Sequence, residues 1–260
     1  FQIFSMHLIL GYNISCYNFI AILLGLLHRT SVFTRQAFTL ISFMIKRSLK
    51  GESMEKVIAV AMSGGVDSSL TAAMLLKQGY KVFGITLWLW VSGTPYDEVP
   101  LAVTDAKKMC DFLGIEHHVI DARDVFYENV VDYFVKEYAY GRTPNPCVFC
   151  NKNIKFDLML NRALELGATH MVTGHYAQVN YNEETGLYEL HKGVDPTKDQ
   201  SYVMYNMNQR ILSHLMFPLG GQCKTETRKL AAEYDLPVAK KPDSVDICFL
   251  PHGNYQKLVV

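Results

Sequence analysis

Two groups of residues in this 260-residue chain have types and spacing suited to chemistry. The first is the glycine-rich stretch SGGVDSS at positions 63–69, which follows a short apolar run. Adjacent glycines let a loop turn tightly with its backbone N–H groups pointing inward, and a helix that begins there adds a partial positive charge. This arrangement predicts a phosphate-binding loop, in which Asp67 can hold a magnesium ion.

The loop is not a Walker A loop, because no lysine follows its glycines. A lysine that grips the β- and γ-phosphates suits hydrolysis at the γ position, so its absence indicates a nucleotide cleaved between the α- and β-phosphates. The alternative is an ordinary strand-to-helix turn whose serines cap the helix. The strand before the loop and the helix after it favour the nucleotide site.

The second group is Cys147 and Cys150, which stand three positions apart immediately before a predicted helix at 152–166. A thiol at a helix N-terminus, with Lys152 and Lys155 nearby, is expected to have a lowered pKa. A zinc ribbon would need a second C-x-x-C pair, and a thioredoxin-type dithiol would not need the nucleotide loop. Sulfur transfer uses both the thiols and the loop.

The elements that position these groups alternate from Met54 onwards between short apolar runs and amphipathic segments. Apolar runs bounded by turn residues predict buried parallel strands, and apolar residues at helical spacing predict helices. We expect strands at 56–62, 81–88, 116–121 and 170–173, and helices at 68–78, 103–113, 125–138 and 152–166. This order predicts an α/β fold with a doubly wound parallel sheet, whose ligands bind at the carboxyl ends of the strands.

The pattern changes after Gly174. Alternating residues around Gly186 predict a hairpin of strands at 177–181 and 187–192, and two further helices are expected at 202–215 and 225–234. We therefore assign 54–220 to a nucleotide-binding α/β domain. Residues 221–260 are predicted to begin a smaller α+β region.

Residues 1–53 differ in composition from the rest, with five basic residues, one acidic residue and an apolar stretch at 19–27. This extension is interpreted as translated upstream sequence, a transit peptide or a membrane anchor, and it is left out of the predicted domain. The whole chain has no net charge, which excludes a histone-like polycation. Its 49% apolar content argues against disorder.

Six blocks of the sequence, in one order, resemble the tRNA-specific 2-thiouridylase (MnmA) family. They are AMSGGVDSS at 61–69, GRTPNPxxxCNKxIKF at 141–156, TGHY at 173–176, KDQSY at 198–202, MFPLG at 216–220 and AKKPDSVDICF at 239–249. The resemblance covers 55–260 and lacks the family's C-terminal domains, so the chain is interpreted as a fragment. It implies a PP-loop ATP pyrophosphatase domain in an enzyme that uses ATP to thiolate C2 of the wobble uridine, U34, of tRNA.

The resemblance also implies roles for individual residues. Cys150 would be the catalytic nucleophile and Cys248 the persulfide carrier, with a disulfide forming between them. The implied ATP-binding positions are Ala61, Met62, Ser63, Gly64, Gly65, Val66, Asp67, Ser68, Leu87 after the second strand, and Gly174. The implied tRNA-binding positions are Asn145, Pro146 and Cys147, at the target base, and Lys198, Asp199 and Gln200.

ATP with Mg²⁺ is the expected cosubstrate, and no permanently bound cofactor is expected. The expected partners are tRNA and an external persulfide donor protein, with no stable membrane partner for 54–260. The location would be cytoplasmic, or organellar if 1–53 is a transit peptide. The family commonly has Asp where this chain has Cys147, which leaves open the role of that position. Two alternatives remain: an iron–sulfur cluster held by Cys147, Cys150 and Cys248, or a nucleotide-binding module without catalysis.

Overall fold

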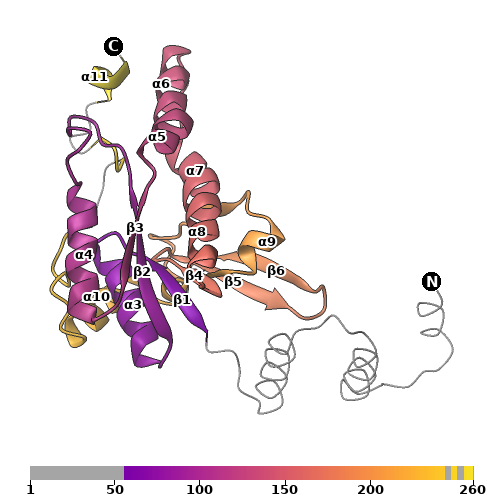
Figure 1. Cartoon of the computed structure of the whole chain (residues 1–260). Coiled ribbons are helices and arrows are strands. Elements are labelled where there is room, and N and C mark those ends of the chain that lie inside the picture. Colours follow the sequence, from indigo (N-terminus) through magenta and orange to yellow (C-terminus); the bar gives the residue numbers. More distant parts are fainter. Residues whose placement is uncertain (1–55, 244–246, 251–254, 260) are drawn as a thin grey trace, which may run out of the picture. The chain divides into compact units, whose positions relative to one another are not determined.

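A computed structural model describes residues 56–243, 247–250 and 255–259 of the chain (Figure 1). Its centre is a parallel sheet of five strands in the order β3-β2-β1-β4-β7. The strands are β1 (Val57–Ala61), β2 (Lys81–Trp88), β3 (His117–Asp121), β4 (His170–Val172) and β7 (Leu215–Met216). The predicted α/β fold with a parallel sheet is confirmed.

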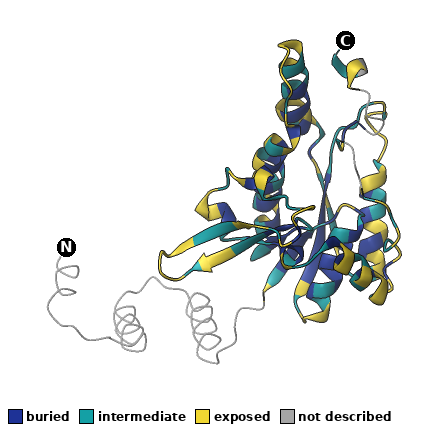
Figure 2. Ribbon diagram, turned by 180° about the vertical axis from the view of Figure 1, so that it is seen from behind, coloured by how far each residue is buried: buried dark blue, intermediate teal, exposed yellow. Residues whose placement is uncertain are grey.

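The apolar strands form because both faces of the sheet are covered. Ile58 and Val60 pack into one apolar cluster with residues of the helices α3 and α4. Ala59, between them, points to the opposite face and joins a second cluster that includes Phe83 and Phe126. The sheet is therefore buried from both sides, as the burial colouring of Figure 2 shows.

The helices lie on the two faces of the sheet (Figure 1). The helices α3 (Val66–Lys77), α4 (Leu101–Leu113) and α10 (Lys224–Glu233) contribute to the cluster of Ile58. The other face is covered by α5 (Arg123–Phe126) and α6 (Asp132–Ala139), joined by a π-helical segment at Tyr127–Val131, and by the helix that carries the cysteines. A short helix, α11 (Gln256–Val259), follows near the C-terminus.

The helix that carries the cysteines begins earlier than predicted. It runs through α7 (Pro146–Cys150), a π-helical segment at Asn151–Met159 and α8 (Leu160–Glu165). The side chain of Asn145 accepts a hydrogen bond from the amide of Val148, and Pro146 occupies the first turn. Both are standard features of a helix start. The two cysteines therefore lie inside the helix rather than before it.

The region after Gly174 differs in part from its prediction. The hairpin is present as β5 (Ala177–Asn182) and β6 (Leu187–Lys192), and α10 matches the helix predicted at 225–234. The helix predicted at 202–215 is wrong, because this stretch forms a 3₁₀ turn at Ser201–Met204, α9 (Gln209–Leu212) and then β7. The pairing of β7 with β4 competes with a continuous helix there, and the side chain of Asn208 caps α9 as a separate element.

The proposed domain boundaries stay predictions. Ala231 of α10 and Leu236 pack into the same cluster as α3, and a further 3₁₀ turn at Pro218–Gly221 precedes α10. The extension at 1–53 lies outside the described residues. Within the described part of the chain, no helix is long and apolar enough to cross a membrane.

Candidate functional site

The glycine-rich loop connects the central strand β1 to α3. Gly64 adopts a positive φ of 68°, and a Cβ on it would lie 2.5 Å from Cβ of Asp105. A Cβ on Gly65 would meet only the hydroxyl of Ser63, at 3.5 Å. No side chain caps the N-terminus of α3 at Gly65. Gly64 is thus needed for packing, whereas Gly65 leaves the first-turn amides open to a ligand.

The loop after β4 packs against this loop. A Cβ on Gly174 would lie 2.8 Å from Cβ of Asp67, so only glycine permits this approach. Because β1 and β4 are adjacent strands whose connections leave in different directions, the two loops meet at the switch point of the sheet, where ligands of such folds bind. Leu87 lies within β2 rather than after it, because the pairing of β2 with β3 continues to Trp88. The nucleotide contacts expected of Gly174 and Leu87 stay predictions.

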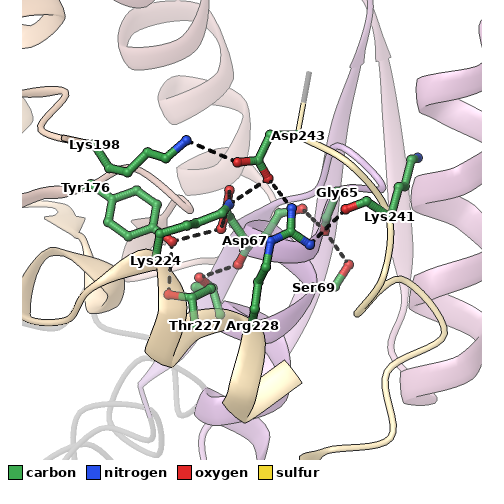
Figure 3. Close-up of polar contacts among 12 residues, drawn as sticks. Gly65, Asp67, Ser69, Tyr176, Lys198, Lys224, Thr227, Arg228, Lys241 and Asp243 are labelled. Atoms are coloured by element: carbon green, nitrogen blue, oxygen red, sulfur yellow. Dashed lines mark hydrogen bonds and ion pairs between the residues drawn. The ribbon is translucent and has the colours of Figure 1, made fainter. Parts of the chain in front are cut away.

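Asp67 carries the strongest polar contacts of the site (Figure 3). The Nζ atom of Lys224, from the start of α10, donates to its two carboxylate oxygens at 2.7 and 2.8 Å. The same Nζ lies 2.9 Å from Oδ1 of Asp243. The hydroxyl of Tyr176 donates to Asp67 at 3.0 Å, and burial raises the pKa of Tyr176, so this hydroxyl stays a neutral donor. Lys224 is therefore shared between two carboxylates.

Asp243 binds two further cations beside Lys224. Arg228 donates to it at 2.7 Å and Lys198 at 3.2 Å. Partial burial raises the pKa of Asp243, but its hydrogen bonds to Lys224 and Lys198 outweigh this effect and hold the pKa below its usual range. In the same segment, Nζ of Lys241 donates to the carbonyl of Gly64 at 3.0 Å. The segment 241–243 is thus fastened to the glycine-rich loop.

The carboxylates at this site fit a magnesium ion that enters with a nucleotide. Protein-bound Mg²⁺ usually takes one or two carboxylates together with substrate phosphates and water. Asp67 and Asp243 are close enough to share one ammonium group, so both are available to one cation. Within the described ranges, no three His, Cys, Asp or Glu side chains are grouped to hold a metal by themselves, the three cysteines of the iron–sulfur alternative included.

Cys150 differs from its prediction. It is 6% exposed and faces the apolar cluster, which contains Phe156. Burial raises the pKa of Cys150 to about 12 and outweighs the nearby charge of Lys155. The predicted lowering of this pKa is wrong, because the helix begins at Pro146 and places Cys150 in the core. Cys147, in the first turn, is exposed.

Cys248 precedes Phe249, which belongs to the same apolar cluster as Cys150. Phe249 is 1% exposed and packs edge-on against Phe126, at 5.6 Å, and Phe134, at 5.4 Å. An ionised Cys248 would raise the pKa of Cys150 further. Desolvation also raises the pKa of Cys248, although the residue keeps an exposed surface. Both thiols are free, and the disulfide between them stays a prediction.

The residues predicted to bind tRNA differ in whether their side chains already have partners within the protein. Asp199 accepts hydrogen bonds from the amides of Gly193 and Ser201, and Gln200 accepts one from the amide of Tyr176, so these two side chains shape their own loop. Lys198 points to Asp243. Asn145 caps α7, Pro146 is buried in its first turn and Cys147 is open to solvent. Their contacts with tRNA stay predictions.

Sequence reasoning missed three cations, a tyrosine and a second carboxylate of this site. These residues are Tyr176, Lys224, Arg228, Lys241 and Asp243. Lys241 and Asp243 lie in the block at 239–249, in which only Cys248 has a residue type that points to chemistry by itself. Lys224 stands 157 positions from Asp67, and no spacing in the sequence connects the two.

Residues 56–252 match the family model described as "tRNA methyl transferase HUP domain". The chain belongs to this family. Among curated proteins, the chain is 49% identical over 209 residues to tRNA-specific 2-thiouridylase MnmA 2 of Thermoanaerobacter sp. (strain X514), which covers 78% of the chain and 57% of that protein. It is also 49% identical over 211 residues to tRNA-specific 2-thiouridylase MnmA of Carboxydothermus hydrogenoformans, covering 78% of the chain and 58% of that protein. The resemblance found in the sequence is confirmed.

The chain of this HUP-domain protein spans a little over half the length of these relatives. Among solved structures, it is similar to an NH3-dependent NAD synthetase from Campylobacter jejuni, with 19% identity, a TM-score of 0.43, and coverage of 82% of this chain and 80% of that chain. A U34-tRNA thiolase, NcsA from Methanococcus maripaludis, aligns with 21% identity, a TM-score of 0.44, and coverage of 82% and 67%.

Proposed function

We propose that this protein is the N-terminal part of an enzyme that uses ATP to replace O2 of U34 in tRNA with sulfur carried as a cysteine persulfide. One observation carries the proposal: two described stretches close in sequence, 241–243 and 247–250, lie at the two halves of the chemistry. Lys241 and Asp243 bind the glycine-rich loop and Lys224, while Phe249, next to Cys248, packs in the apolar cluster that holds Cys150. The family match and the relatives named 2-thiouridylases support this function.

The first step is adenylation of the base. O2 of U34 attacks the α-phosphorus of ATP, the bond from this phosphorus to the bridging oxygen breaks, and pyrophosphate leaves with the electron pair. The N3 proton of the uracil is released to solvent. The open amides at the start of α3 lie where they can stabilise negative charge on the phosphates. A magnesium ion held by Asp67 would supply further neutralisation of this charge when bound.

The second step transfers sulfur. An external donor loads Cys248 with one sulfur atom, and the thiolate of Cys150 attacks Sγ of Cys248. The persulfide bond breaks and hydrosulfide leaves, which adds to C2 of the adenylated uridine and expels AMP; the sulfur-bound proton moves to N3. A Cys150–Cys248 disulfide remains, and a dithiol reductant restores the two thiols.

The high pKa of Cys150 has a consequence for this step. A thiol attacks only as its thiolate, and burial keeps Cys150 protonated at neutral pH in the state described. We propose that tRNA binding at the exposed start of α7 opens this site and lowers the pKa of Cys150. The target base must leave its stack to reach the site, as bases do in other enzymes that modify them.

The assignment of the sulfur carrier is tested by persulfide labelling. The protein is loaded by a cysteine desulfurase with cysteine, alkylated and mapped by peptide mass analysis. We expect the additional sulfur on Cys248 and its loss in Cys248→Ser. Cys223→Ser is the matched control, because Cys223 caps α10 and serine is a preferred helix cap. Additional sulfur on Cys147 instead would contradict the assignment.

A further inference from the structure

Lys224 occupies an unusual position for a lysine. Its side chain is only 11% exposed, and its ammonium group lies between two carboxylates, those of Asp67 and Asp243. Asp67 belongs to the first turn of α3, next to the uncapped amides of the glycine-rich loop. The structure therefore brings a lysine to a loop whose own sequence has none after its glycines (Figure 3).

Several charged side chains surround Lys224. Lys198, Lys224 and Arg228 all contact Asp243, and Lys224 also contacts Asp67. These ion pairs join three cations to two carboxylates, while a third carboxylate, Asp195, accepts from the backbone amide of Lys224. The N-terminus of α3 adds a partial positive charge. Cations gathered beside an uncapped helix N-terminus favour an anionic ligand.

We propose that Lys224 is a catalytic residue that binds the departing pyrophosphate of ATP. On nucleotide binding, its ammonium group leaves Asp67 for oxygens of the β-phosphate, and Asp67 becomes free to bind magnesium. This inference rests on the proposed cleavage of ATP between the α- and β-phosphates.

The chemistry of lysine suits this exchange. Its ammonium group is a compact charge on a flexible stem with three donors, so it can turn from one acceptor to another without movement of the helix. When the bond to the α-phosphorus breaks, negative charge accumulates on the pyrophosphate, and a nearby cation stabilises that charge in the transition state. Asp243 remains as a second partner that keeps the ammonium group aimed at the loop.

Calorimetry of pyrophosphate and ATP binding tests the role of Lys224 without tRNA. Lys224→Met should weaken the binding of both by about tenfold or more, which is the usual range for a lost charged hydrogen bond. Adenosine binding should be unchanged, and Lys224→Arg should retain part of the affinity. The control is Lys229→Met, on the same helix, whose side chain is 78% exposed. Unchanged pyrophosphate affinity in Lys224→Met would overturn the proposal.

A double variant separates direct binding from general charge. In magnesium-free buffer, Asp67→Asn should bind pyrophosphate more tightly, because it removes the carboxylate that competes for Lys224. The variant that combines Asp67→Asn with Lys224→Met has the same net charge as the unchanged protein. If Lys224 contacts the anion, this variant binds pyrophosphate at least about tenfold more weakly. Affinity equal to that of the unchanged protein would show that Lys224 only neutralises Asp67.

Circular dichroism and thermal melting verify that each variant is folded before its affinity is compared. The outcomes also separate this inference from the proposed function. Loss of pyrophosphate binding in Lys224→Met supports the inference even if no tRNA is thiolated. If that variant instead thiolates tRNA and keeps full pyrophosphate affinity, the inference is wrong and the proposed function still holds.

Discussion

Cys147 and Cys150 lie one helical turn apart yet meet opposite environments. Cys147 is exposed, while Cys150 is buried with a pKa raised to about 12. We predict that iodoacetamide at pH 7.5 alkylates Cys147 much faster than Cys150. The rate at Cys150 should rise with pH between 7 and 9, because its thiolate fraction increases about tenfold per pH unit below its pKa. Peptide mass analysis over time measures both rates, and equal rates at pH 7.5 would contradict the burial of Cys150.

At the scale of residues, the reactive residue types were predicted correctly, but the environment of Cys150 was not. A C-x-x-C pair was visible, but whether each thiol is exposed depends on where the helix begins. That information was present in Asn145 and Pro146, a cap and a first-turn proline. The ion pair of Lys224 with Asp67 is different, since it arises only from the packing of distant parts of the chain.

At the scale of elements, Lys241 contacts the glycine-rich loop, and Phe249, further along the chain, belongs to the apolar cluster that holds Cys150. Phe249 packs there against Phe126 and Phe134. We predict that Phe249→Ala separates Cys248 from Cys150 and costs about 3 kcal/mol of stability, as is usual for a buried Phe. Mild oxidation with diamide should form the Cys150–Cys248 disulfide in the unchanged protein and much less of it in Phe249→Ala.

The control for this experiment is Phe112→Ala, because Phe112 is 52% exposed on α4. ATP affinity, measured in parallel, should survive Phe249→Ala because the loop contacts of Lys241 and Asp243 remain. Equal disulfide yield in Phe249→Ala and the control would show that Phe249 does not position Cys248.

The long apolar strands were predictable and the short elements were not. The runs that became β1 and β2 are apolar on both faces and end at turn residues, so local pattern and tertiary burial agree. The strand β7 has only two residues, Leu215 and Met216, and its identity depends on its partner β4. A two-residue strand carries no periodic pattern, so a helix was predicted in its place.

At the scale of the whole molecule, three partly buried histidines set the response to acid. Desolvation lowers the pKa of His117 and His170, and lowers that of His175 to about 3. The unfolded chain binds protons to these groups from about pH 6.5 downwards, while the folded protein does not. Their contribution to stability is therefore present above pH 6.5 and is lost as pH falls toward the folded pKa.

We predict that the free energy of unfolding falls between pH 7 and pH 5, by at most about 1.4 kcal/mol per pH unit for each histidine. Urea unfolding at several pH values measures this slope. His175→Gln should make the slope shallower, whereas His191→Gln, at an exposed site in the hairpin, should leave it unchanged. A slope that is the same in all three proteins would show that the fold does not hold His175 as a neutral group.

The measurement that tests the proposed function most directly is nucleoside mass analysis of tRNA after reaction. Unmodified tRNA is incubated with the full-length protein, Mg-ATP, a persulfide donor and a dithiol reductant, then digested and analysed for 2-thiouridine. We expect one 2-thiouridine per tRNA, located at U34, formed with one AMP and one pyrophosphate. Cys150→Ser and Cys248→Ser should form none, and Cys223→Ser should match the unchanged protein. Consumption of ATP without 2-thiouridine, or thiolation that survives Cys248→Ser, would contradict the proposed function.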